Sequence, residues 1–196
     1  MANGTLKVSN IQTSSGSGTI TIGQSGETIS IPSGATIANS GTATGFGDDN
    51  KPAFRATMSS NQTSLSLSTQ TLVQFNTETF DEGSCFNTSN YRFVVPSGEA
   101  GKYCITAHIH TRIESSASTG KSVRLLKNGS FLTETVDSLD SNLYNTRSNH
   151  QQITAIENLS VDDYIEVYSM CWQGSGTGTF SIQTESSFFT AFKLII

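Results

Sequence analysis

The chain of 196 residues has few charged residues, and its positive charges are not clustered. Asp, Glu, Lys and Arg make up 14% of the sequence, and the formal net charge is −5. Proteins that bind nucleic acid usually place groups of lysines and arginines against the phosphates. The sequence therefore predicts no nucleic-acid partner.

Cysteines and long apolar segments are also scarce. Cys85, Cys104 and Cys171 are odd in number and lack Cys-x-x-Cys spacing, so we expect buried free thiols rather than disulfides or bound zinc. No apolar stretch approaches the roughly 20 residues of a membrane-spanning helix. The first residues lack the basic and apolar regions of a signal peptide. We therefore expect no membrane insertion.

Short apolar runs separated by turn-forming residues occupy the chain from residue 52 to residue 196. No run carries a helical period, and apolar residues that alternate with polar ones are typical of strands. The sequence of Asn128-Gly129 is that of a two-residue hairpin turn. About ten short strands fit an all-β, two-sheet jelly roll. We predict strands near residues 53–58, 64–67, 71–76, 91–95, 102–114, 121–127, 131–136, 149–157, 163–172, 179–184 and 187–196.

The first 43 residues contain a short approximate repeat. Segments 18–26 and 26–34 each hold two isoleucines at a spacing of two, which would share one face of a strand about four residues long. Such short strands cannot cover their isoleucines alone. We therefore predict an N-terminal β-prism-like stalk (1–43) formed with other copies, a hinge (44–51) and a head (52–196). A disordered Gly/Ser linker is the alternative to the stalk. The predicted stalk core consists of Ile20, Ile22, Ile29 and Ile31.

A series of short motifs runs through the head: Pro52–Phe54, Val73–Asn76, Tyr91–Pro96, Gly101–Tyr103, Leu126–Gly129, Leu159–Ile165 and Ser187–Phe192. In this order they resemble the C1q/TNF-like superfamily of trimeric jelly-roll heads. Two positions depart from the family pattern, because Asp162 and Ala191 stand where the family usually has glycine. The resemblance implies a homotrimer that associates through its inner sheet. The strand at 187–196 is apolar on both faces, which also favours a subunit interface. The expected interface residues are His108, His110, Phe188, Phe192 and Leu194.

The N-terminal segment carries a second resemblance. The runs Leu6–Thr13, Gly16–Ile22 and Ile31–Gly34 are similar to the openings of virion proteins from marine tailed phages. This similarity implies a non-enzymatic virion structural protein that assembles in the host cytoplasm and attaches to capsid or tail proteins through its stalk. Two roles stay open: a tail fibre or spike that adheres to a host surface glycan, and a capsid decoration protein that stabilises the particle. A secreted C1q-like ligand is a further alternative, disfavoured by the missing signal peptide and collagen repeat.

His108, His110 and Glu114 raise a metal-site hypothesis, because their spacing places them on one face of a strand. The pattern is similar to that of cupins, jelly-roll proteins that use it in metal-dependent catalysis. The Pro-x-Gly-x-x-His segment that completes the cupin site is missing. We therefore favour histidines packed at a subunit interface and no cofactor. An axial metal shared by three copies and a cupin-like enzyme are the alternatives. A calcium site is also considered, with these candidate ligands: Asp137, Asp140, Asp162 and Asp163.

Tyr164, Tyr168 and Trp172 share one face of a late predicted strand. If exposed, they would form a surface recognition site on which a sugar ring can stack, and if covered, they would pack against a neighbouring strand or subunit. The sequence offers no Gly-x-Ser-x-Gly nucleophile elbow between a strand and a helix. These features favour a protein that assembles and binds, and that is not an enzyme.

Overall fold

The computed structural model describes residues 9–13, 18–38, 40, 51–114, 119–138, 148–172 and 178–194. The chain divides into two compact units, Met1–Phe46 and Gly47–Ile196. The boundary between them falls within the predicted hinge, of which only Lys51 is among the described residues.

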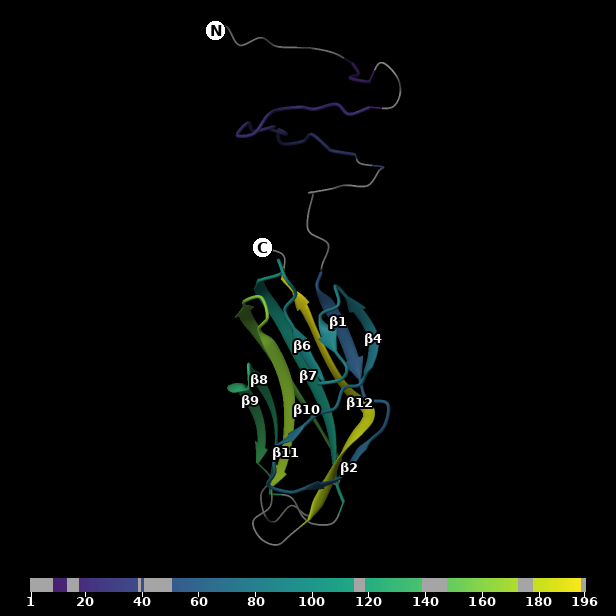
Figure 1. The fold of residues 1–196 in the computed structure, drawn as a ribbon, viewed down its shortest axis with the longest axis vertical. Coiled ribbons are helices and arrows are strands. Elements are labelled where there is room, and N and C mark those ends of the chain that lie inside the picture. Colours follow the sequence, from purple (N-terminus) through teal and green to yellow (C-terminus); the bar gives the residue numbers. More distant parts are fainter. Residues whose placement is uncertain are drawn as a thin grey trace. The chain divides into compact units, whose positions relative to one another are not determined.

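The second unit is a sandwich of two antiparallel sheets, each with six strands (Figure 1). Sheet A has the order β10-β7-β12-β1-β4. The short strand β2 also pairs with β12, near the start of β12, whereas β1 pairs near its end. The strands of sheet A are β10 (Ser148–Leu159), β7 (Gly101–Ile113), β12 (Thr179–Lys193), β1 (Ala53–Thr57), β4 (Thr77–Glu82) and β2 (Gln62–Ser66).

Sheet B has the order β5-β6-β11-β8-β9, and β3 pairs with β11. Its strands are β5 (Phe86–Asn87), β6 (Arg92–Val94), β11 (Tyr164–Trp172), β8 (Gly120–Lys127), β9 (Ser130–Ser138) and β3 (Thr71–Leu72). The described part of the chain contains no helix, and hence none long and apolar enough to cross a bilayer. The prediction of an all-β, two-sheet jelly roll is confirmed.

The core lies between the sheets and is built from strict alternation along the long strands. On β7 the side chains of Tyr103, Ile105, Ala107 and Ile109 are all 0% exposed, because a period of two turns them all towards sheet B. An aromatic cluster fills one part of this core. Its members are Phe54, Phe75, Phe86, Phe93, Tyr103 and Phe189.

The β8–β9 hairpin has the predicted Asn-Gly turn. Asn128 and Gly129 adopt φ angles of 53° and 75°, which match a type I′ turn that follows the twist of the strands. Asp162, which replaces the family's glycine, adopts a φ of 67°. That backbone conformation favours glycine, so the turn before β11 keeps the glycine conformation with a different residue.

The strand predictions were wrong in several places: β5 was not predicted, and β3 is shorter than the predicted strand at 71–76. Strand β4 was not predicted, because its sequence Thr-Glu-Thr-Phe-Asp-Glu lies at a solvated sheet edge and has no apolar alternation. The runs predicted at 179–184 and 187–196 form one strand, β12, whose register shifts between Gln183 and Phe188. An irregularity of this kind interrupts the period of two, so the sequence resembles two strands.

The cysteines are free thiols, but one of them is not buried as predicted. Cys85 and Cys171 lie in the core, where burial raises the pKa of both thiols, that of Cys171 to about 12. Cys104 is half-buried, because its position on β7 turns it to the outer side of sheet A.

The described residues of the first unit contain turns and no strand. Backbone hydrogen bonds close turns from Gln24 to Glu27 (3.0 Å) and from Pro32 to Ala35 (3.1 Å). The predicted strands are therefore not present in the single chain, which offers them no neighbouring strand. The isoleucines are 43–61% exposed, so their role as a stalk core stays a prediction about the oligomer. They are Ile20, Ile22, Ile29 and Ile31.

Candidate functional site

The outer face of sheet A, the face turned away from the core, gathers most of the predicted site residues. Along this face the structure shows three neighbouring features: an apolar band, a histidine stack and a polar cleft. Strands β10, β7 and β12 run through the first two, and β2 contributes to the third (Figure 1).

The apolar band consists of Ile156, Cys104 and Phe192. These residues lie side by side on β10, β7 and β12, since Cys104 is the register partner of both Ile156 and Phe192. Ile156 is 62% exposed and Phe192 is 37% exposed. Phe80, further along the same sheet on β4, is 43% exposed. Apolar side chains gathered on one flat sheet face are typical of an interaction surface.

The histidine stack lies next to the apolar band and consists of His108, His110, His150 and Phe188. The ring centroids of His110 and His150 are 4.1 Å apart, and those of His108 and His150 are 5.3 Å apart. Phe188 stacks on His108 at 5.6 Å, and the guanidinium of Arg55 lies 4.2 Å from the centre of the Phe188 ring. The predicted interface residues of β7 and β12 are thus brought together, and Leu194, just after β12, is half-buried.

Hydrogen bonds hold two imidazole rings of the stack in place. Nδ1 of His108 lies 2.7 Å from the carbonyl of Ser186, and Nδ1 of His110 lies 3.1 Å from the carbonyl of Glu185. Because a carbonyl only accepts, each Nδ1 carries a proton. Nε2 of His110 pairs with the hydroxyl of Ser148, which can donate to it. Both ring nitrogens of His110 therefore have hydrogen-bond partners.

His150 is the member of the stack that the sequence pattern did not single out. Desolvation lowers the pKa of its imidazole, His110 and His108 lower it further, and Glu185 acts in the opposite direction. The residue lies 40 positions after His110, and only the antiparallel register of β10 with β7 places the two opposite each other. No local spacing could have revealed this contact.

The structure does not bring Glu114 into a metal site with the histidines. Among the described residues there is no group of three or more His, Cys, Asp or Glu side chains that could hold a metal ion. Oε2 of Glu114 instead accepts a hydrogen bond from the backbone of Ser64 at 3.2 Å. Both ring nitrogens of His110 already have partners. The geometry of the described residues therefore gives the cupin-like hypothesis no ligand set.

Two of the four aspartates considered for calcium, Asp163 and Asp137, serve other contacts. Asp163 binds Lys127, Asn128 and the backbone of Ser160 at 2.7–2.8 Å. Burial raises the pKa of Asp163, but these three hydrogen bonds outweigh it and lower that pKa to about 2. Asp137 accepts a hydrogen bond from Asn149 at 2.8 Å. Asp140 lies outside the described residues.

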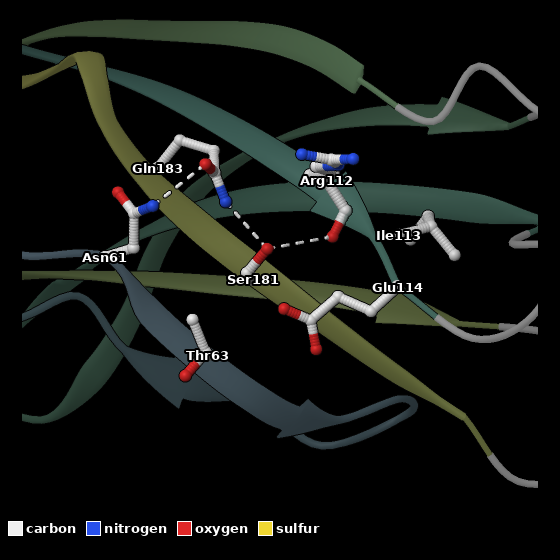
Figure 2. Close-up of a pocket in the computed structure, with 7 residues that line it drawn as sticks. All are labelled: Asn61, Thr63, Arg112, Ile113, Glu114, Ser181 and Gln183. Carbon is white, nitrogen blue, oxygen red and sulfur yellow. Dashed lines mark hydrogen bonds between the residues drawn. The ribbon is translucent and has the colours of Figure 1, made fainter.

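The polar cleft lies where β2 meets the end of β7 and the start of β12, and it has a volume of about 310 Å³. Figure 2 shows a chain of hydrogen bonds along its wall. Asn61 donates to Gln183 at 3.0 Å, Gln183 donates to Ser181 at 2.7 Å, and Ser181 donates to the Arg112 carbonyl at 3.4 Å. The lining residues are Asn61, Thr63, Arg112, Ile113, Glu114, Ser181 and Gln183.

The cleft offers both signs of charge to a ligand. Arg112 and Glu114 are exposed at the end of β7, and within the described part of the chain the Arg112 guanidinium makes no ion pair. Amides, hydroxyls, a carboxylate and a guanidinium are groups that hydrogen-bond sugar hydroxyls and carboxylates. No sequence pattern predicts this site, because its residues come from three segments far apart in the chain.

The three aromatic residues considered for recognition lie on the outer face of sheet B, all half-buried. The guanidinium of Arg92 lies 4.2 Å from the centre of the Tyr164 ring. Trp172 packs so closely on Gly120 that a β-carbon there would lie 2.3 Å from its ring. One side of two of these rings is therefore occupied within the chain, and sugar stacking by Tyr164, Tyr168 and Trp172 stays a prediction.

No protein-family profile matches the chain, and no curated protein is similar to it in sequence. Solved structures do share its architecture. Murine APRIL aligns with a TM-score of 0.52 at 13% identity, over 72% of this chain and 98% of APRIL. The Eiger TNF of S. frugiperda aligns with a TM-score of 0.51 at 16% identity, over 72% and 91% of the two chains. The head is a TNF/C1q-like jelly roll.

The globular domain of zebrafish complement 1qA aligns over 74% of this chain and 98% of its own, at 17% identity and a TM-score of 0.48. The fold assignment rests on APRIL and Eiger, whose scores are higher. At these identities the similarity establishes the fold and says nothing of ligand or partner. Function has to be argued from the surface of this chain.

Proposed function

We propose that the chain is a homotrimeric, non-enzymatic virion structural protein whose heads bind a glycan. The main support for a trimer is the apolar band on the outer face of sheet A. Ile156 and Phe192 are exposed side by side in the single chain. Burying such side chains contributes about 1.5–3 kcal/mol each, which favours association through this face.

The virion role is supported by the N-terminal unit. Its isoleucines are exposed in the single chain, as they would be in a stalk whose core forms only from several copies. The similarity of this segment to the openings of phage virion proteins favours the same role. Attachment to capsid or tail proteins would then occur through residues 1–43, leaving the heads free.

Of the two virion roles, the polar cleft favours adhesion. A protein that only clamps a capsid has no need for a cleft with an exposed arginine and glutamate. Three heads on one stalk would make a weak sugar contact multivalent. Because the Arg112 guanidinium makes no ion pair among the described residues, we propose that the glycan carries a carboxylate, as uronic acids do.

Native mass measurement of the purified full chain tests the trimer. Three copies are expected, and a monomer at all concentrations would reject the proposal. Counting copies per virion separates the two roles, since a decoration protein is far more numerous than a fibre. Elemental analysis of the same sample addresses the metal-dependent alternatives, because a stoichiometric metal would revive the axial site at one ion per three chains or the cupin at one per chain.

Binding of glucuronic-acid oligosaccharides to the full chain tests the cleft. Arg112→Gln should weaken binding about tenfold or more, since a charge-assisted hydrogen bond contributes about 1.5–3 kcal/mol. Lys102→Gln is the matched control, because Lys102 is an exposed cation at the other end of the same strand. Equal losses in both variants would indicate a general charge effect and reject the cleft as the site.

A further inference from the structure

One end of the sandwich core is polar and contains a fully buried lysine. Lys121 on β8 is 0% exposed. Its neighbours at this end of the core include Thr111, Gln151 and Ser169, which are 0–7% exposed. A lysine is almost never fully buried without a specific reason, and neither the fold nor the proposed trimer requires one here.

Lys121 faces a carboxylate on the next strand. In the β8–β9 ladder its register partner is Asp137, so the two side chains lie on the same face of the sheet. Strand β10 of the other sheet also reaches this point, because the Gln151 amide donates to the Lys121 carbonyl at 3.2 Å. Strands β8, β9 and β10 therefore meet around Lys121.

Asn149 brings an amide to the same carboxylate. It precedes Gln151 by two residues on β10 and therefore projects to the same side of the strand. Its Nδ2 donates to Oδ2 of Asp137 at 2.8 Å. Its Oδ1 is buried and has no hydrogen-bond partner among the described residues. An amine and a carboxamide thus converge on Asp137.

The surroundings make the Lys121 amine easier to deprotonate than a solvated lysine. Burial lowers the pKa of Lys121, while Cys171 and Asp137 act in the opposite direction. The competing nucleophile, the Cys171 thiol, is held protonated because its pKa is raised to about 12. A desolvated lysine is a recognised way to activate an amine for attack on a carbonyl carbon.

We propose that Lys121 and Asn149 form an intramolecular isopeptide bond, with Asp137 carrying the proton. Nζ of neutral Lys121 attacks Cγ of Asn149, and the Nζ–Cγ bond forms as the Cγ–Nδ2 bond breaks. Asp137 accepts a proton from Nζ and delivers it to Nδ2, which leaves as ammonia. The step needs no oxidant, cofactor or other reactant. Its product is a covalent tie between β8 of sheet B and β10 of sheet A.

A second set of the same three residue types shows why the reaction is confined to this place. Lys127 pairs with Asp163 at 2.8 Å, and Asn128 donates to the same carboxylate at 2.7 Å. The Lys127 side chain is 29% exposed and ion-paired with Asp163, so this set lacks the burial that surrounds Lys121. This surface set is a built-in control for the buried one.

Intact-mass measurement of the denatured full chain tests the bond. The wild-type chain is expected to be about 17 Da lighter than its sequence, the mass of one ammonia, and a digest should contain a branched peptide that joins β8 to β10. The variants Lys121→Met, Lys121→Arg and Asn149→Ser should show their full sequence masses. Lys127→Met should keep the deficit, because it changes only the solvated set.

Asp137→Asn tests the proton carrier and keeps the volume of the side chain. Bond formation should slow about a hundred-fold or more, the usual contribution of general acid–base catalysis, so the freshly purified variant should be mostly unlinked. Circular dichroism of each variant shows whether it has folded. If Lys121→Met fails to fold, Lys121→Arg serves in its place, because arginine keeps a positive charge and a long aliphatic stem.

Three outcomes would overturn the proposal. A wild-type chain with its full mass excludes the bond. A deficit of about 17 Da that persists in Lys121→Met identifies a succinimide at an Asn-Gly pair, such as Asn128-Gly129, which forms with the same loss. A deficit of about 18 Da shows loss of water, which would join Lys121 to Asp137 and reject Asn149 as the acceptor.

Discussion

Replacing Ile156 by threonine should separate assembly from folding. Ile156 is 62% exposed in the single chain, and threonine retains the β-branched shape that suits a strand. The head should therefore keep its fold and its unfolding midpoint as a monomer. The loss should appear only where the apolar band is covered by another copy.

The size of this loss follows from the exposed fraction. Complete burial of an isoleucine side chain contributes about 1.5–3 kcal/mol, so the exposed 62% of Ile156 corresponds to about 1.5 kcal/mol per chain and about 4.5 kcal/mol per trimer. The trimer dissociation constant should then rise about 2,000-fold. The concentration at half-dissociation varies as its square root and should rise about 45-fold.

Sedimentation equilibrium over a concentration series measures this shift, and thiol labelling provides a second signal. Cys85 and Cys171 are buried in the core, whereas Cys104 is half-buried beside Ile156. A maleimide should therefore react with Cys104 in the monomer and be excluded from it in the trimer. Val136→Thr on sheet B is the matched control, because Val136 is 51% exposed and lies away from sheet A. An unchanged midpoint in Ile156→Thr, or an equal shift in the control, would refute the assignment of this face.

Two further perturbations address the histidine stack and the stalk. The pKa of His150 is lowered in the folded chain, so its stabilising contribution is present above the ordinary histidine pKa of about 6.5 and is lost as the pH falls below it. Thermal unfolding between neutral pH and mild acid should show this loss. His150→Asn should reduce it, because it removes the group whose pKa is lowered, and an unchanged acid sensitivity would exclude His150 as its source. The second perturbation places serine at all four predicted stalk-core positions: Ile20, Ile22, Ile29 and Ile31. This variant should lose attachment to the particle and keep a folded head. Normal incorporation with wild-type protease resistance would show that these residues form no stalk core.

The fold was predictable wherever the chain alternates strictly. On β7, residues at a spacing of two are completely buried. The Asn128-Gly129 pair correctly predicted the turn of the β8–β9 hairpin. The prediction failed where the local pattern carries no such signal. Strand β4 is solvated and polar, and the irregularity of β12 interrupts its period.

The candidate sites were only partly predictable, for a related reason. Placing His108 and His110 on the outer face needs only parity along β7. The contact of His150 with His110 needs the register between two strands, and the cleft needs Asn61, Arg112 and Gln183 to meet from three strands. Strand register and tertiary contacts depend on packing between distant segments of the chain. A single sequence does not show this packing.

The shift in register within β12 has a consequence for how such a protein can diversify. Before the shift, Ser181 and Gln183 line the cleft, and after it Phe188 and Phe192 belong to the histidine stack and the apolar band. In the proposed function, a single strand would thus serve recognition with one segment and self-association with another. If the cleft binds a sugar as proposed, its residues could change to fit another sugar without altering the proposed subunit interface. A library randomised at Asn61, Thr63 and Gln183 should therefore yield heads of altered specificity with an unchanged oligomeric state.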